Sequence, residues 1–328
     1  MIKVSSPVAY GSGAYIAHKS LESGLCDYKV YPYNPYWALF PPAIRCFGDR
    51  SADIIHAPVD YAVFSRVKDK PLVATFHGYV LDRYMHDYVS TLHNIHYRTD
   101  LKWFILQALK KSDVITCVSK YLAGLIMEDL DYKGGIRIIY NGIDINKFKP
   151  TIIKKHHSDI KVLYCGGPGR RKGADLIPAI LEKTHVNIKL VYTSGVKSDY
   201  RFIKHPKACW LGSVDYDFMP SLYNDVDVLL LPTVREGFGL AVAEAMACGL
   251  PVIATDCSSL PELIDNNKSG FLCTTGDVEM FAEKIKLLAQ SPGLRQEMGE
   301  YNRQKVEQNF TLDRMAREYQ LLFEEVLS

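Results

Sequence analysis

The chain has 328 residues, and domains of about 100 to 200 residues predict two of them rather than one or four. Hydrophobic residues make up 48% of the chain and charged residues 23%, a composition that excludes disordered, collagen-like and coiled-coil proteins. The net charge is only +2, so we expect no binding to nucleic acid, and any anionic ligand must be held by local groups.

The eight cysteines contain no Cys-x-x-Cys motif and no Cys/His cluster with zinc spacing. We therefore expect reduced thiols and a cytoplasmic protein. The first residues lack the apolar region of a signal peptide. No run of about 18 apolar residues predicts a membrane-spanning helix.

The first half of the chain alternates short β-rich segments with helical patterns, which predicts a parallel sheet. Strands are expected at residues 2–10, 28–32, 53–57, 71–77, 113–119 and 136–140. Residues 98–111 carry an apolar stripe with helical spacing and end in two lysines that suit a helix carboxyl end.

The pattern restarts after a polar stretch at 151–159, with further strands expected at 160–166, 188–194, 226–232 and 251–255. The sequence thus predicts two parallel α/β domains in tandem. We place an N-terminal domain at 1–148, a C-terminal domain at 149–310 and a terminal helix at 311–328, with Thr311 as its N-cap.

The most informative segment is LLLPTVREGFGLAVAEAMACGLPVIAT, residues 229–255. A buried strand ends at Pro232, a glycine-rich loop follows, and a helix is predicted from Leu240 to Cys248. Gly237 and Gly239 allow close approach of the backbone to a ligand, and free N–H groups at the helix start favour phosphate or sugar oxygens. The loop follows a parallel strand, at the edge of the sheet where such folds bind ligands.

Glu244 is unusual because its neighbours in the predicted helix are all small or apolar. A buried carboxylate needs hydrogen-bond donors, and the two vicinal hydroxyls of a ribose would supply them. The alternative is a solvent-facing Glu244, which is the default for an isolated glutamate. The spacing from Glu236 and the glycine-rich loop favours the first interpretation.

Residues 236–252, E-G-F-G-L-x-x-x-E-A-M-A-C-G-x-P-V, closely resemble the signature of the retaining GT-B glycosyltransferase family 4. Further matching motifs are Gly11-Ser12-Gly13, His77-Gly78, Val118-Ser119, Asn141-Gly142-Ile143-Asp144, Lys172-Gly173, Gly212, Leu222-Tyr223, Pro261-Glu262 and Gly270-Phe271-Leu272. The resemblance implies a GT-B fold, in which two Rossmann-like domains face each other across a cleft and the C-terminal helix returns toward the first domain. It places the nucleotide-sugar mostly on the second domain and the acceptor on the first.

The resemblance also implies roles for single residues. Glu244 would hold the ribose hydroxyls, Glu236 would contact the donor sugar, and Lys172 would neutralise the diphosphate. His77 would lie beside the donor sugar and orient it; the alternative is a strand-end histidine bonded to backbone. Gly13 would let the first domain's loop close over the diphosphate, and backbone amides facing the donor are expected at Gly237, Phe238, Gly239 and Leu240.

A basic glycine-rich loop, CGGPGRRKGADL at 165–176, offers cations and N–H groups for a departing diphosphate. Family members usually carry an Arg several residues before the Lys-Gly, but here the loop is shorter and Gly166 falls at that position. We assign the role to Arg170, with Arg171 as the rival, and expect Gly167 and Gly212 in the donor site. A surface basic run is the alternative.

Two Asp-x-Asp sequences, at 215–217 and 225–227, resemble metal-binding motifs of another glycosyltransferase fold. Asp227 matches a structural position of family 4, so we expect structural carboxylates and metal-independent catalysis. Gly11-Ser12-Gly13 alone is weak evidence for a dinucleotide site, and no acidic residue ends the second strand, which disfavours NAD.

The expected reaction is front-face transfer with retention, from a UDP or GDP sugar to a hydroxyl of a glycan, lipid-linked or small-molecule acceptor, with no other cofactor. Two alternatives stay open: another GT-B enzyme, inverting or phosphorolytic, and a non-catalytic scaffold. The first domain holds 14 of the 21 tyrosines, and its segment 79–98 suits a peripheral membrane contact, although core packing is the more common reason for aromatic residues.

Overall fold

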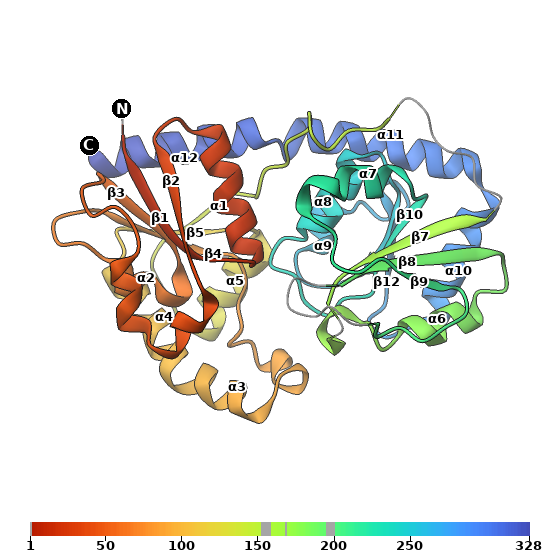
Figure 1. Cartoon of the computed structure of the whole chain (residues 1–328), viewed down its shortest axis with the longest axis horizontal. Helices are drawn as coiled ribbons and strands as arrows, with labels where there is room; N and C mark the ends of the chain where they lie inside the picture. The colour runs from red at the N-terminus through yellow and green to blue at the C-terminus, as the bar shows by residue number, and fades with distance from the viewer. Residues whose placement is uncertain (1, 152–158, 168, 195–200) are drawn as a thin grey trace. The chain divides into compact units, whose positions relative to one another are not determined.

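The computed structural model describes residues 2–151, 159–167, 169–194 and 201–328. Most of the polar stretch expected at 151–159 therefore lies outside the described residues. The chain divides into two compact units (Figure 1). Unit 1 comprises Met1–Gly142 and Thr311–Ser328, and unit 2 comprises Ile143–Phe310.

Unit 1 contains a six-stranded parallel sheet in the order β2-β1-β3-β4-β5-β6. Its strands are β1 (Val4–Ala9), β2 (Tyr28–Tyr33), β3 (Ile54–Pro58), β4 (Leu72–Phe76), β5 (Val114–Cys117) and β6 (Ile136–Ile138). All six coincide with segments that the sequence predicts as strands.

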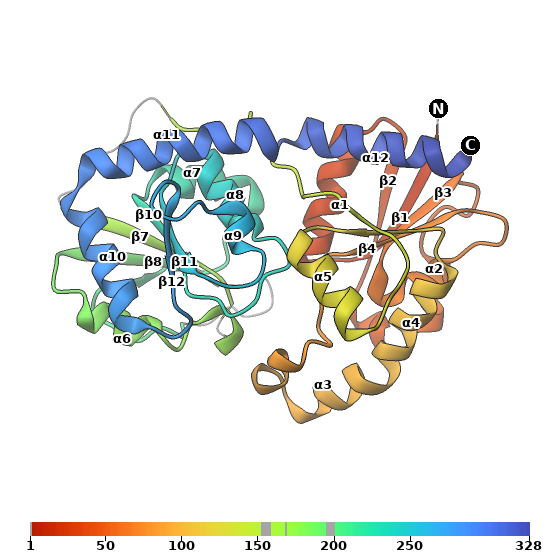
Figure 2. The ribbon, with the colours of Figure 1, turned by 180° about the vertical axis from the view of Figure 1, so that it is seen from behind.

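Helices cover both faces of this sheet. The helical elements are α1 (Gly13–Gly24), η1 (Pro35–Leu39), η2 (Pro41–Cys46), η3 (Val59–Tyr61), α2 (Ala62–Ser65), η4 (Arg83–Tyr88), α3 (Thr91–His96), η5 (Tyr97–Leu101), α4 (Lys102–Lys111), α5 (Lys120–Asp129) and α12 (Leu312–Leu327). Helices α1 and α12 pack together on one face, and α2 and α4 lie over the other (Figures 1 and 2). The C-terminal helix is thus part of unit 1, as expected.

Unit 2 has a second six-stranded parallel sheet, in the order β12-β11-β10-β7-β8-β9. Its strands are β7 (Ile160–Cys165), β8 (Ile188–Thr193), β9 (Ala208–Trp210), β10 (Val228–Leu231), β11 (Val252–Thr255) and β12 (Gly270–Cys273). The central strand β10 is buried on both faces, which explains its continuous apolar sequence.

The helical elements of unit 2 are η6 (Arg170–Lys172), α6 (Ile177–Lys183), η7 (Tyr216–Phe218), α7 (Met219–Asn224), α8 (Leu240–Ala247), α9 (Leu260–Leu263), α10 (Val278–Gln290) and α11 (Pro292–Asn309). Helices α6 and α10 share one apolar core with the sheet, and α8 packs on α7 and α11. No helix in the described parts of either unit is long and apolar enough to cross a membrane.

The sequence prediction is wrong in three places. Strands β9 (ACW) and β12 (GFLC) were not predicted, because they contain no β-branched residue and show no alternation that distinguishes them from loops. The helix expected at 98–111 begins instead as a π-helical turn, Tyr97–Leu101, and becomes regular only at Lys102. Thr311 caps α12 as predicted, because its Oγ1 accepts a hydrogen bond from the Arg314 amide at 3.2 Å.

Candidate functional site

The glycine-rich loop of unit 2 joins the carboxyl end of β10 to the amino end of α8. The helix begins at Leu240, as the sequence predicts, and its N-cap is Gly239 with φ +97°. A Cβ at Gly239 would lie 3.1 Å from Leu260 and 3.2 Å from Leu263. The left-handed φ and the crowding by the two leucines favour glycine at this position. No side chain caps α8, so its first amides are available to a ligand.

Hydrogen bonds from neighbouring segments hold this loop. The Glu236 amide donates to Ser258 Oγ at 2.9 Å, and Ser259 Oγ donates to the Glu236 carbonyl at 3.1 Å. Thr233 Oγ1 donates to the Arg171 carbonyl at 3.0 Å. Sequence reasoning did not identify these three supporting residues. The feature of the sequence that could identify them is their position after a predicted strand. Both serines follow β11, and Thr233 follows the adjacent strand β10.

Lys172 and Glu236 form an ion pair, with Nζ 2.6 Å from Oε1. Their side chains are only 24% and 11% exposed. Burial works to raise the pKa of Glu236, but the charges of Lys172 and Arg171 outweigh it and hold that pKa below its usual value. The structure thus brings together two residues that the sequence placed in one site, and Glu236 is ionised at neutral pH.

Gly173 explains how Lys172 reaches this position. Its φ is +72°, and a Cβ there would lie 2.0 Å from the Pro232 carbonyl oxygen. The backbone after Lys172 therefore contacts the end of β10 directly, at a distance that no other residue permits.

The two candidate arginines of the basic loop differ in their surroundings. Arg171 donates from Nη1 to the Arg235 carbonyl at 3.0 Å, so it contacts the glycine-rich segment. Arg170 lies at the surface with its side chain 68% exposed and 3.6 Å from Asp175. Arg171 is thus the one that touches the loop between β10 and α8.

Glu244 is buried in α8, with an exposed fraction of 4%. The solvent-facing alternative is therefore wrong. Each carboxylate oxygen accepts a phenol hydrogen bond of 2.9 Å, one from Tyr216 and one from Tyr223. Burial raises the pKa of Glu244 to about 7, although both phenols and Lys147 oppose that rise. A further acceptor lone pair on each oxygen remains for a ligand hydroxyl.

The amino-acid sequence alone does not identify these two phenols as partners of Glu244. Tyr216 lies inside one of the Asp-x-Asp sequences, and Tyr223 belongs to the family motif Leu222-Tyr223. Tyr216 is preceded by Asp215, which caps η7, and its ring lies 5.6 Å from that of Phe148. A buried glutamate in an apolar helix predicts that donors exist, but not which segments supply them.

The remaining sites predicted on unit 2 have mostly backbone roles. The Gly167 carbonyl accepts from the Tyr164 hydroxyl at 3.1 Å, and the Gly212 carbonyl accepts from the Ser194 amide at 2.9 Å. Phe238 is buried and packs edge-on to Phe310. Gly237 lies in the loop before α8, in the same turn as Glu236.

Unit 1 carries the other two predicted residues. Gly13 is the first residue of α1, next to the capping Ser12. His77 follows β4 directly, and its Nε2 lies 2.9 Å from Nε2 of His18. Burial lowers the pKa of His77 to about 3, so the ring is neutral. Its Nδ1 atom is buried without a hydrogen-bond partner among the described residues.

The Asp-x-Asp carboxylates have structural partners. Asp215 accepts from the Asp217 amide at 3.0 Å, and Asp217 pairs with Lys147 at 2.6 Å. Lys161 pairs with Asp225 through its side chain, and its amide donates to Asp227 at 2.8 Å. Within the described ranges, no group of three His, Cys, Asp or Glu side chains is arranged to hold a metal ion.

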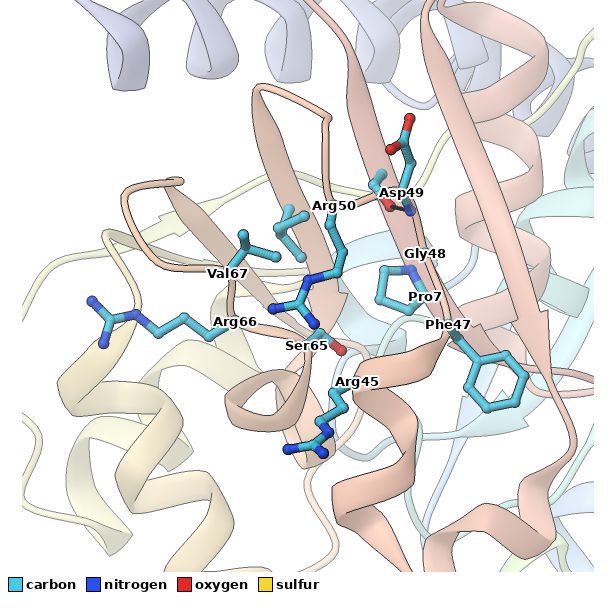
Figure 3. Close-up of a pocket in the computed structure, with 11 residues that line it drawn as sticks. Pro7, Arg45, Phe47, Gly48, Asp49, Arg50, Ser65, Arg66 and Val67 are labelled. Carbon is cyan, nitrogen blue, oxygen red and sulfur yellow. Dashed lines mark hydrogen bonds between the residues drawn. The ribbon is translucent and has the colours of Figure 1, made fainter.

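A small hollow lies on unit 1, over the sheet face that α2 covers (Figure 3). Three exposed arginines line it: Arg45 from η2, Arg50 from the loop after η2, and Arg66 at the end of α2. None of these guanidinium groups forms an ion pair with a described acidic residue. Figure 3 shows that the Arg66 side chain points away from the other two.

Two family models match the chain. The model of Glycosyl transferases group 1 matches residues 147–305, and the model of Glycosyltransferase Family 4 matches residues 20–147. Together they cover most of the sequence, and the chain belongs to this family of glycosyltransferases. Its two Rossmann-like α/β units are those of the GT-B fold, as the sequence predicts.

Curated relatives agree with this assignment. The N-acetyl-alpha-D-glucosaminyl L-malate synthase of Bacillus anthracis is 27% identical over 92% of this chain and 82% of its own length. The capsular polysaccharide biosynthesis glycosyltransferase CapM of Staphylococcus aureus is 26% identical over 79% of this chain and 75% of its own. The protein is therefore a glycosyltransferase.

Solved structures share its fold at low identity. The sucrose-phosphate synthase of Thermosynechococcus elongatus superposes with a TM-score of 0.84 at 17% identity, over 99% of both chains. The Anabaena protein HepE, solved in complex with UDP and glucose, gives a TM-score of 0.79 at 17% identity, over 99% of this chain and 100% of its own.

Proposed function

We propose that the protein transfers a sugar, with retention and without a metal ion, from a nucleoside-diphosphate-sugar to an acceptor hydroxyl. The observation that carries this proposal is the partly buried pair of Lys172 and Glu236 beside the amino end of α8. Cations and N–H groups converge there on one edge of the unit 2 sheet, as a diphosphate requires.

The chemistry follows from where charge develops. When the bond between the sugar's anomeric carbon and the phosphate oxygen breaks, the diphosphate gains negative charge, which fixed cations stabilise more than they stabilise the intact donor. We assign this stabilisation to Lys172 and Arg170, with the amides of Gly237 to Leu240, and we place Arg171, Gly167 and Gly212 in the donor site. The new bond forms to the acceptor oxygen, and the acceptor's proton passes to the departing phosphate oxygen.

We assign Glu236 to the donor sugar and Glu244 to the ribose. A carboxylate that already accepts two phenol hydrogen bonds is fixed in position, so it can accept ribose hydroxyls without losing side-chain entropy. His77 on unit 1 is assigned to orient the sugar, since its buried Nδ1 has no described partner. Gly13 is assigned to the unit 1 loop that would close over the diphosphate.

The donor nucleotide is proposed to be UDP or GDP, and the acceptor a glycan, a lipid-linked saccharide or a small molecule. The first measurement is the thermal stability of the protein with UDP, GDP, ADP and NAD in turn, with and without EDTA. A nucleotide at 100 times its dissociation constant adds about 2.7 kcal/mol of stability. A shift with one nucleoside diphosphate that EDTA leaves unchanged supports the proposal, whereas a shift with NAD alone, or with none, refutes it.

Two further measurements test the reaction itself. The anomeric configuration of the product, read by NMR, separates retention from the inverting alternative. The variant Glu236→Ala should lose transfer, whereas Glu279→Ala should not, because Glu279 forms a surface pair with Lys183 at 2.7 Å elsewhere on unit 2. Equal activity of both variants would contradict the site.

We also propose that unit 1 binds an anionic membrane surface. Elements η1 and η2 leave apolar side chains in solvent, with Tyr36 80%, Leu39 86% and Phe40 63% exposed. Two of the arginines at the hollow in Figure 3, Arg45 and Arg50, lie in η2 or just after it, and no described acidic residue forms an ion pair with them. Apolar and basic side chains together favour binding to anionic lipid.

Co-sedimentation with vesicles tests this contact. Binding should be stronger to phosphatidylcholine vesicles that contain phosphatidylglycerol than to phosphatidylcholine alone. The double variants Leu39→Ser/Phe40→Ser and Arg45→Ala/Arg50→Ala should each weaken it, and Leu287→Ser, an exposed leucine on unit 2, should not. Equal binding to the two kinds of vesicle, or binding that neither double variant weakens, refutes the membrane proposal.

A further inference from the structure

A row of polar side chains lies on the face of the unit 1 sheet that α1 and α12 cover. Side chains alternate between the faces of a strand. The strand register sets Ser5 beside Ile55 and His56 beside Val73, so Ser6, His56 and Thr75 all point to this face. His77 continues the alternation two residues beyond Thr75.

One half of the row leads from His77 to Tyr28. His77 Nε2 lies 2.9 Å from Nε2 of His18, a residue of α1. On the other side of that ring, His18 Nδ1 lies 2.6 Å from Ser6 Oγ and 2.7 Å from the Tyr28 hydroxyl. His18 thus uses both ring nitrogens, one toward His77 and one toward two hydroxyls.

The other half leads from Tyr28 across the sheet. The Tyr28 hydroxyl lies 2.7 Å from His56 Nδ1, and His56 Nε2 lies 2.6 Å from Thr75 Oγ1. Thr75 and Thr116 are register partners on β4 and β5, with their hydroxyls 2.6 Å apart. The Tyr319 hydroxyl of α12 lies 3.4 Å from the first and 3.3 Å from the second.

This row is buried and uncharged. His18, His56, Thr75 and Thr116 have no exposed surface. Burial lowers the pKa of His18 and of His56 well below the usual value, and neighbouring histidines add to that effect. A buried polar group is costly unless it is hydrogen-bonded, so three neutral imidazoles here each need a donor and an acceptor in the right places.

The direction of these hydrogen bonds is linked along the row. A neutral imidazole has one N–H and one acceptor nitrogen, and each hydroxyl has one hydrogen. If His18 Nδ1 accepts from Ser6 or Tyr28, then His18 Nε2 donates to His77 Nε2, and His77 carries its hydrogen on Nδ1. In the opposite direction His77 donates from Nε2 and leaves Nδ1 as an acceptor. His18 therefore determines what Nδ1 of His77 offers.

We propose that His18 is a positioning residue, which holds the His77 ring in one orientation and one tautomer and so presents Nδ1 to a substrate oxygen. The inference rests on the function proposed above, in which His77 orients the sugar. Simple core packing does not account for the arrangement, because it needs no ring nitrogen at His18 and would not leave Nδ1 of His77 buried without a described partner.

Two substitutions of His18 separate positioning from packing. The amide of Gln reaches the position of the ring Nε2, and the amide of Asn reaches that of Nδ1. His18→Gln therefore keeps a partner for His77, whereas His18→Asn keeps a partner only for Ser6 and Tyr28. His93→Asn, an exposed histidine of α3, is the control for the chemical change.

The first readout is NMR of the protein labelled with ¹⁵N at its histidines, which reports the protonation of each ring nitrogen. The His77 signals are assigned by their loss in His77→Gln. We expect one protonated and one bare nitrogen in the wild type, in His93→Asn and in His18→Gln, and averaged signals in His18→Asn. Averaged signals in the wild type, or unchanged ones in His18→Asn, would overturn the proposal. This measurement does not depend on activity.

The second readout is steady-state transfer with the nucleotide-sugar that the stability measurements identify. His18→Asn should lower kcat about tenfold or more while the donor KM changes by less than about threefold, because the donor still binds but is misoriented. His18→Gln should recover most of this loss. In a His77→Ala background, His18→Asn should have no further effect, since it acts through His77.

The outcomes separate the two proposals. Additive losses in the double variant, or equal losses in His18→Gln and His18→Asn, overturn the positioning role while the transferase function stands. A wild type that transfers no sugar from any nucleotide donor overturns the proposed function, and the NMR result then decides on the positioning of His77 alone.

Discussion

Removing the positive charge beside Glu236 is the sharpest test of the partly buried pair in unit 2. Lys172→Met keeps the length and the apolar stem of the side chain but leaves Glu236, which is 11% exposed, without the cation at 2.6 Å. Breaking a buried pair costs about 3 to 5 kcal/mol. Because Lys172 keeps 24% exposure and Arg171 still favours the carboxylate, we expect about 3 kcal/mol at pH 8.

The cost should depend on pH. In the wild type the pKa of Glu236 is depressed, so its contribution to stability is complete above the pKa of the unfolded chain and is lost only as pH falls through the lower folded value. In Lys172→Met, burial is weakly opposed and raises that pKa. The loss of unfolding free energy caused by Lys172→Met is then complete above the raised pKa of Glu236 and becomes smaller as the Glu236 carboxyl takes up a proton. The variant should therefore lose less stability at pH 5 than at pH 8.

Urea unfolding of unit 2 measures this effect. Trp210 lies on β9 of unit 2, so its fluorescence reports that unit in a Trp37→Phe/Trp103→Phe background. Lys183→Met is the matched control, because its pair with Glu279 is exposed at 53% and 66% and should contribute little to stability. Lys172→Met/Glu236→Gln should recover most of the stability. Equal losses for the two lysine variants at pH 8, or the same loss for Lys172→Met at pH 5 and pH 8, would refute the reasoning.

Three further predictions concern the same unit. If ribose hydroxyls donate to Glu244, the ionised form of Glu244 binds the nucleotide. Because its pKa is about 7, the nucleotide affinity of the wild type, measured by calorimetry, should rise about tenfold between pH 6 and pH 8 relative to that of Glu244→Gln. Parallel pH profiles of the two proteins would contradict this. Tyr223→Phe leaves one Glu244 oxygen without its hydrogen-bond donor at 2.9 Å, so it should lower the free energy of unfolding in urea by about 1.5 kcal/mol at pH 8. The loss should be smaller at pH 5, where Glu244 is protonated. An equal loss at the two pH values argues against an ionised acceptor. Gly173→Ala should destabilise unit 2 by about 2 kcal/mol or more, because its Cβ would lie 2.0 Å from the Pro232 carbonyl, whereas Gly293→Ala has open space and should cost little; similar values for both would show that the contact is relaxed at no cost.

The parts of the fold that the sequence predicted are those with strong local patterns. The apolar run at β10 and the helix start at Leu240 each depend on a few consecutive residues, and both lie where expected. Strands β9 and β12 contain no β-branched residue and no alternating pattern, and they form by pairing with β8 and β11. Such strands depend on neighbours distant in sequence, which local propensity does not describe.

The candidate site likewise has residues that the sequence predicted and residues that it did not. The sequence indicated that Glu236, Lys172 and Glu244 share one site, because a long motif contains two of them, and the structure places Lys172 against Glu236. Their partners were not predictable. Tyr216 lies 28 residues from Glu244 in sequence, and His18 lies 59 residues from His77, so each pairing is decided by the topology of a whole unit.

The division of the chain has a consequence for how the protein is made. Unit 2 is one uninterrupted segment, but unit 1 needs α12, whose buried Tyr319 and Phe323 complete its core. Because domains fold as units while the chain leaves the ribosome, the second unit can finish before the first, whose helix α12 is synthesised after all of unit 2. Until α12 is made, the sheet face that it covers in unit 1 is exposed to water, so a truncation within α12 should destabilise unit 1 and leave unit 2 intact.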